Sequence, residues 1–247
     1  MEGRRVMETR IDEIGDGIYR MATFASDAGG PSGITFCEFV IAGDEPLLFH
    51  CGHRQRFALG AAALARVMPV ERLRWIGYSH AEADEAGAVN EWLGAAPNAM
   101  AIQGRIGCNI WLNDIAIRPP RALKDGETID LGGKVVRYIA TPHLPHCWDA
   151  GLLYEETTGT LFCSDLFAQP GEAALISDGD ILTPAIAFES GAHATSLTPN
   201  TGKMIRKLAA LKPRRLALMH GPVYSGDAAA ALNALADYYD GELRAAL

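Results

Sequence analysis

The sequence predicts an α/β protein in which helices cover the outer faces of β-sheets. Three observations lead to this class: apolar runs typical of strands come first, strand and helix patterns alternate after them, and an amphipathic helix and a long alanine-rich helix follow towards the carboxyl end. No linker long enough to separate two independent units interrupts residues 1–247. We therefore expect a single domain.

Each expected element rests on a local pattern. The first strands, in which β-branched and aromatic residues are bounded by glycine-rich or proline-containing turns, cover 17–24, 34–41 and 46–49. Apolar positions at helical spacing then predict a helix over 57–67 and another that starts at residue 84 or 85 and ends at 93. A short apolar strand over 73–79 lies between these two helices.

Strand and helix patterns continue to alternate in the rest of the chain. The next elements are a strand over 99–102, a helix over 105–112 and strands over 126–131, 134–141, 151–155 and 159–164. The last are an amphipathic helix over 200–211, a strand over 215–219 and a helix over 227–247. The segment 169–195 is rich in glycine and proline, and we expect it to shape a pocket.

Composition excludes several classes of protein. Of the 247 residues, 49% are hydrophobic and 21% charged, and no apolar stretch approaches the roughly 20 residues that a membrane-spanning helix needs. A formal net charge of −8 argues against nucleic acid or an anionic membrane surface as a partner. The first residues, Met1 to Arg5, contain no apolar signal-peptide core, so we expect a cytoplasmic protein.

The cysteines indicate neither a disulfide framework nor a structural zinc knuckle. They are odd in number and contain no C-x-x-C pair: Cys37, Cys51, Cys108, Cys147 and Cys163. Each is expected to be a small buried hydrophobe, with Cys147 as the exception because it adjoins a candidate metal ligand.

The segment His80-Ala81-Glu82-Ala83-Asp84-Glu85 is the most informative feature of the chain. It follows the apolar run 73–79 and places one imidazole and three carboxylates at the expected end of a buried strand. Burying that much negative charge requires a compensating cation. The segment therefore predicts a metal site.

Three further strands are followed by residue types that bind metals. The strand over 134–141 precedes His143 and His146, the strand over 159–164 precedes Asp165, and the strand over 215–219 precedes His220. Such strand ends deliver their side chains to one rim of a sheet. Imidazoles combined with several carboxylates and no thiolate make a hard, anionic site that suits iron or manganese, although zinc competes at most nitrogen and oxygen sites.

With these residues in place, the sequence resembles the metallo-β-lactamase superfamily, and within it the flavodiiron or oxygen-binding di-iron branch. The superfamily motif is H-x-H-x-D-H and that of the branch is H-x-E-x-D-H, whereas this chain ends the motif with Glu85. Residues 90–99, 124–133 and 161–167 are also similar to the branch, and the resemblance runs from about Ile11 to Ala229. It implies a four-layer αββα sandwich with two metal ions at one edge of the sheets.

The resemblance also implies which residues hold the metals. One ion would be bound by His80, Glu82 and His146, the second by Asp84 and His220, with Asp165 as a bridge between them. Glu85 stands where the branch usually has histidine. It either ligates the second metal or points away and leaves a position for water.

Two histidines are assigned by comparison with the branch pattern. His146 is preferred as ligand because the branch follows its ligand with W-P-D, and here Cys147-Trp148-Asp149 follows. His143 is then a neighbour of the ligands, or the ligand itself if the loop register differs by three residues. His50 stands where superfamily members commonly have an aspartate buried beneath the metals. We expect His50 to replace this aspartate as a group that contacts the metal ligands.

Three classes of function are compatible with such a site. The first is a non-haem di-iron protein that binds or reduces dioxygen or nitric oxide. The resemblance covers the metallo-β-lactamase-like part only, without a flavodoxin domain. We therefore expect no flavin on this chain and either a separate redox partner or a role as an oxygen sensor.

The alternative is a hydrolase in which a metal-bridging hydroxide attacks an ester, lactone, thioester or phosphodiester. Tyr224 would then stabilise an oxyanion, unless it only packs in the core. A binding protein that keeps the metals for structure is a third class. We expect two metal ions, iron ahead of zinc or manganese, and a small-molecule ligand or substrate, while the helix over 227–247 is compatible with a homodimer.

Overall fold

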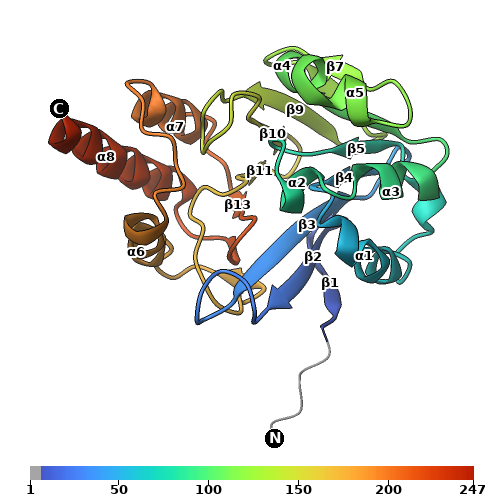
Figure 1. The fold of residues 1–247 in the computed structure, drawn as a ribbon, viewed down its shortest axis with the longest axis horizontal. Coiled ribbons are helices and arrows are strands. Elements are labelled where there is room, and N and C mark those ends of the chain that lie inside the picture. Colours follow the sequence, from blue (N-terminus) through green and yellow to red (C-terminus); the bar gives the residue numbers. More distant parts are fainter. Residues whose placement is uncertain (1–6) are drawn as a thin grey trace, which may run out of the picture.

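The computed structural model describes residues 7–247. Two β-sheets lie face to face and helices cover the outer face of each, which gives the layers of the expected αββα sandwich (Figure 1). The expected lack of a signal peptide concerns residues 1–6, which lie outside the described residues. Within residues 7–247, no helix is both long enough and apolar enough to cross a membrane.

The strands of the first sheet follow one another in sequence order. An antiparallel part consists of β1 (Thr9–Gly15), β2 (Ile18–Ala25), β3 (Ile34–Ile41) and β4 (Leu47–Phe49). A parallel part continues from β4 with β5 (Trp75–Gly77), β6 (Met100–Gly104) and β7 (Arg121–Leu123). Every residue of β3 is buried, because this strand has strands on both sides and packed layers on both faces.

The second sheet has the order β12-β14-β13-β11-β10-β9-β8. Its antiparallel part consists of β8 (Thr128–Asp130), β9 (Val135–Ala140), β10 (Gly151–Glu155) and β11 (Thr160–Phe162). Strand β13 (Arg215–Ala217) pairs in parallel with β11, and β14 (Val223–Tyr224) and β12 (Ile176–Ser177) complete that edge.

The helices lie on opposite sides of the sheet pair (Figure 1). Those beside the first sheet are α1 (Phe57–Leu64), α2 (Ala83–Ala86), α3 (Val89–Ala95), α4 (Arg105–Gly107) and α5 (Asn113–Ile115), with a π-helical turn over Cys108–Leu112 and 3₁₀ turns over Arg54–Arg56 and Val70–Arg72. Those beside the second sheet are α6 (Leu182–Ala192), α7 (Thr201–Ala209) and α8 (Ala228–Ala246).

Three apolar layers hold these elements together. Between the sheets, the rings of Phe39 and Phe49 pack edge-on against Phe162, at centroid distances of 5.2 and 5.8 Å. A second layer around Trp92 joins the first sheet to its helices, and a third around Leu232 joins the second sheet to α7 and α8. Because packed layers cover both faces of the central strands, every residue of β3, β4, β5 and β11 is buried, whereas β8 and β9 alternate between buried and more exposed residues.

The structure differs from the sequence prediction in two places near the site. The helix expected up to residue 93 is two helices, α2 and α3, because the backbone N–H of Ala88 donates to the carbonyl of Gly52 at 2.9 Å rather than continuing α2. The glycine- and proline-rich segment 169–195 contains helix α6 as well as the short strand β12.

Candidate metal centre

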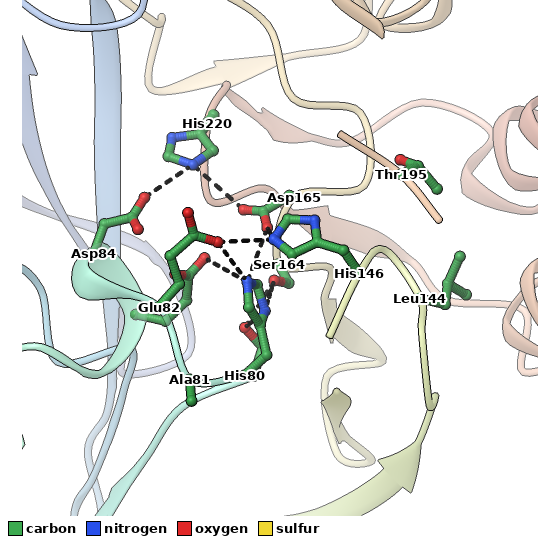
Figure 2. A network of polar contacts seen from close by, with 12 residues as sticks. His80, Ala81, Glu82, Asp84, Leu144, His146, Ser164, Asp165, Thr195 and His220 are labelled. Carbon is green, nitrogen blue, oxygen red and sulfur yellow. Dashed lines mark hydrogen bonds and ion pairs between the residues drawn. The ribbon is translucent and has the colours of Figure 1, made fainter. Parts of the chain in front are cut away.

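Four strand ends and one short helix bring the expected ligands to a single rim of the two sheets. They are His80 after β5, His146 in the loop after β9, Asp165 after β11, His220 after β13, and Glu82, Asp84 and Glu85 at the start of α2. Figure 2 shows six of these side chains converging, with Asp165 between the histidines. Residues that are up to 140 positions apart in the sequence thus meet in one cluster, as His80 and His220 do.

His80, Glu82 and His146 form what we call the first position. The Oε2 atom of Glu82 lies 3.2 Å from Nε2 of His80 and 2.8 Å from Nε2 of His146. Together with a carboxylate oxygen of Asp165, these ligand atoms lie within 4.8 Å of one another. Ligands at roughly 2.0–2.2 Å from a common ion are separated by distances of this order.

Asp84, Glu85 and His220 form the second position. The Oδ2 atom of Asp84 lies 3.3 Å from Nε2 of His220, and one ligand atom from each of the three residues lies within 4.8 Å of the others. The Oε1 atom of Glu85 is also 3.8 Å from Nε2 of His80, so Glu85 stands between the two positions.

Asp165 faces both positions with different oxygen atoms. Its Oδ2 lies 3.5 Å from Nε2 of His80 and 3.5 Å from Nε2 of His146, whereas its Oδ1 lies 3.3 Å from Nε2 of His220. A carboxylate in this orientation can give one oxygen to each of two cations. The geometry is therefore that of a bridging ligand.

The buried carboxylate of Glu85 indicates that these residues fit a metal ion. Its side chain is 1% exposed, its neighbours include the carboxylates of Asp84 and Asp165, and no lysine or arginine in residues 7–247 forms an ion pair with it. A buried carboxylate without such a partner is costly, and a cation held in front of it removes that cost. The donor set of carboxylates and imidazoles fits a pair of divalent ions, which the four carboxylates would neutralise.

Hydrogen bonds outside the ligand set orient two of the imidazoles. The Nδ1 atom of His220 donates to the backbone carbonyl of Thr35 at 3.0 Å, which leaves its Nε2 free to bind a cation. The Nδ1 atom of His80 lies 3.0 Å from Oγ of Ser79, which in turn is 2.7 Å from Oγ of Ser164. Sequence reasoning missed these partners, although Ser79 and Ser164 directly precede the ligands His80 and Asp165.

The acids and bases of the site shift one another's pKa values. Hydrogen bonds from His146 and then His80 lower the pKa of Glu82 to about 2. Burial opposes the charged form of His220, but Asp165 and Asp84 outweigh it and raise the pKa of this imidazole. Burial, and then the charges of Asp165 and Asp84, raise the pKa of Glu85 well above its usual range. The negative charges of Asp165 and Asp84 thus oppose ionisation of Glu85, and a bound cation would relieve this repulsion.

The two remaining histidine candidates, His50 and His143, differ in burial. His50 is fully buried, with Nδ1 3.4 Å from the carbonyl oxygen of Cys37, and burial lowers the pKa of its imidazole to about 4. The charge of Asp165 acts on the pKa of His50 in the opposite direction. His143 is exposed and belongs to none of the metal-binding groups found in residues 7–247. Of the two histidines of this loop, His146 is the one that lies in a candidate metal-binding group.

Tyr224 lies on β14 and packs against the apolar layer of the second sheet, with its hydroxyl over Gly226. This placement supports a packing role. All five cysteines are free, and four of them are buried. Cys147 is half-buried, and its Sγ lies within 4.8 Å of a ring nitrogen of His80 and of His146, so these three residues form a further candidate metal-binding group. Burial raises the pKa of its thiol to about 11.

Comparison of the sequence with protein-family models identifies the family of this chain. The family model described as ODP family beta lactamase matches residues 35–221, a range that contains all the candidate ligands of both positions. This chain belongs to the ODP family. The match confirms the resemblance to metallo-β-lactamase-like proteins that the motif indicated.

Comparison with individual proteins agrees with the ODP assignment. The curated "Putative diflavin flavoprotein A 1" from Nostoc sp. is 29% identical over 147 residues, which are 58% of this chain and 25% of that protein. A flavo di-iron protein mutant from Thermotoga maritima superposes with a TM-score of 0.84 at 20% identity, covering 96% of this chain and 63% of that one. The rubredoxin oxygen:oxidoreductase from Desulfovibrio gigas gives a TM-score of 0.82 at 19% identity, with coverages of 94% and 62%.

These likenesses confirm the fold of the ODP-family chain. The chain spans a quarter of the length of the curated relative and less than two thirds of the two solved chains.

Proposed function

We propose that this ODP-family chain binds two iron ions, one in each position, and that it binds and reduces dioxygen or nitric oxide there. The observation that carries the proposal is the orientation of Asp165, whose two oxygens face two separate sets of ligands. The relatives support the chemistry, since they are described as diflavin and flavo di-iron proteins and as an oxygen:oxidoreductase.

A bound pair of ferrous ions supplies two electrons and open coordination positions for a diatomic molecule. The protein's part is to fix the two positions and to limit access of water. Asp165 sets the spacing between them, and the hydrogen bonds to Thr35 and Ser79 keep two imidazoles in place. The ring of Phe36 packs edge-on against His220 at a centroid distance of 5.3 Å and covers that side of the second position.

We propose a separate redox protein as the electron donor, with the flavin carried by that partner. The free cysteines support a reducing compartment such as the cytoplasm as the place of action. Homodimerisation stays a prediction that sedimentation analysis would test.

Hydrolysis is the less favoured chemistry for this donor set. Zinc hydrolases rely mostly on imidazole, whereas here four carboxylates accompany three imidazoles. Zinc-loaded protein is therefore expected to be inactive on a panel of esters, lactones, thioesters and phosphodiesters.

Oxygen and nitric oxide consumption tests the proposal. Iron-loaded, chemically reduced protein is mixed with either gas in solution, and the decay is recorded with an electrode. His146→Asn removes a ligand of the first position, whereas His143→Asn alters an exposed histidine of the same loop and serves as the matched control. Asparagine suits the control because His143 has a φ of +67°, a backbone conformation that asparagine tolerates.

The wild type and His143→Asn should consume the gas, and His146→Asn should consume it more slowly by at least about tenfold. Even the loss of a group that only orients a metal ligand typically lowers metal affinity or activity by about 10- to 100-fold. Consumption by wild type no faster than by His146→Asn would contradict the proposal. So would zinc-dependent hydrolysis that His146→Asn abolishes.

A further inference from the structure

The two positions differ in donor chemistry. The first position contains two imidazoles, of His80 and His146, and one carboxylate of its own, Glu82. The second contains one imidazole, of His220, and two carboxylates of its own, Asp84 and Glu85. Asp165 contributes one oxygen to each. The first position is therefore richer in nitrogen and the second richer in anionic oxygen.

Glu85 is the residue that creates this difference. An imidazole in its place would make the two positions nearly equivalent, with two nitrogen donors each. The side chain of Glu85 is 1% exposed, and its Oε1 lies 3.8 Å from Nε2 of His80, so the contacts of this carboxylate lie within the cluster of candidate ligands. Its position in the first turn of α2, next to Asp84, aims the pair at His220.

Donor type determines which cation a position prefers. Imidazole nitrogen suits borderline ions such as Zn²⁺ and Fe²⁺, whereas carboxylate oxygen suits harder ions such as Mn²⁺. Affinity for zinc exceeds that for manganese at most sites, so the preference shows in how two ions distribute between two positions of one protein.

We infer that the two positions are chemically unequal and that the second, because of Glu85, takes the harder cation while the first takes the borderline cation. The inference rests on the proposed function in that both positions must bind metal. It predicts an ordered mixed-metal site when two kinds of ion compete. With iron alone, the same inequality makes the second position the better holder of the ferric state, since three carboxylates face it.

The experiment is a competition with a structural readout. Metal-free full-length protein receives one equivalent of Zn²⁺ and an excess of Mn²⁺, and it is then crystallised. Anomalous difference maps recorded on both sides of the zinc and manganese absorption edges identify the ion in each position without any measurement of activity. Two variants accompany the wild type: Glu85→His, which supplies the missing imidazole, and Glu85→Gln, which keeps the shape of the side chain and removes its charge.

In the wild type, zinc should occupy the position of His80 and His146, and manganese the position of His220. Glu85→His should let zinc divide between the two positions, and Glu85→Gln should lose manganese from the second. Zinc spread equally over both positions of the wild type, or zinc at His220, would overturn the inference while leaving the dinuclear site intact. Wild-type protein that binds no ion in either position would overturn the proposed function and this inference with it.

Discussion

Replacing Glu38 by glutamine should make the stability of the protein less dependent on pH. Glu38 lies on β3, where its side chain is 6% exposed and its Oε2 has no hydrogen-bond partner among the described residues. Burial raises the pKa of this carboxyl from 4.5 to about 8, against a smaller opposing effect of Arg56. The backbone of Gly52 packs so close to the Glu38 carboxylate that any side chain at position 52 would collide with it.

The direction of the effect follows from proton binding. Between the unfolded pKa of 4.5 and the folded pKa of about 8, folded protein keeps a proton on Glu38 that the unfolded chain has released. Stability is therefore greatest below the unfolded value and is lost as pH rises through the folded one. Each pH unit between these two pKa values lowers the free energy of unfolding by roughly 1.36 kcal/mol. From 4.5 to about 8, the protein therefore loses about 5 kcal/mol of stability, and this loss is complete at alkaline pH.

Urea unfolding followed by circular dichroism measures this contribution as the difference between wild type and Glu38→Gln, in which the other titrating groups cancel. Both proteins carry the same metals. At about pH 5 their unfolding free energies should agree within about 1 kcal/mol, and at about pH 9 the variant should be the more stable by several kcal/mol. A difference that stays constant with pH would refute the buried, protonated state of Glu38.

Three further substitutions test single contacts of the site. Asp165→Ala should leave fewer than two metal ions per chain by elemental analysis, because it removes the shared carboxylate, and two retained ions would rule out the bridge. Ser79→Ala should weaken metal binding in the first position by roughly 10- to 100-fold in a chelator competition, because His80 loses the nearer of the two hydroxyl partners of its Nδ1 and keeps only Ser164 at 3.4 Å. An unchanged affinity would make the Ser79 contact irrelevant. Tyr224→Phe should change neither metal content nor gas consumption, since the hydroxyl lies over Gly226, and a loss of activity would restore Tyr224 as a functional residue.

Much of the fold could be predicted where local patterns and final packing agree. The strand expected over 34–41 is β3 (Ile34–Ile41), because a run of β-branched and aromatic residues between turns leaves few alternatives. The short strands β12 and β14 could not be predicted, since two residues make no pattern and their parallel pairing joins Ile176 to Val223. The division of α2 from α3 depends on the carbonyl of Gly52, which the local sequence does not indicate.

The candidate ligands at strand ends could be proposed from sequence for a similar reason. Each follows an apolar strand, so the strand pattern locates His80, Asp165 and His220 at one rim before any coordinates are known. The groups that orient them were not all accessible, because the carbonyl of Thr35 is 185 residues from His220 and belongs to no motif. The preference for His146 over His143 came from the residues that follow it, and the loop geometry supports this preference by placing His146 in a candidate metal-binding group.

An iron anomalous difference map from crystals of iron-loaded protein tests the central claim most directly. Two peaks are expected, one bounded by His80, Glu82 and His146 and the other by Asp84, Glu85 and His220, with Asp165 in contact with both. A map with one peak, with none, or with iron bound elsewhere on the protein would contradict it.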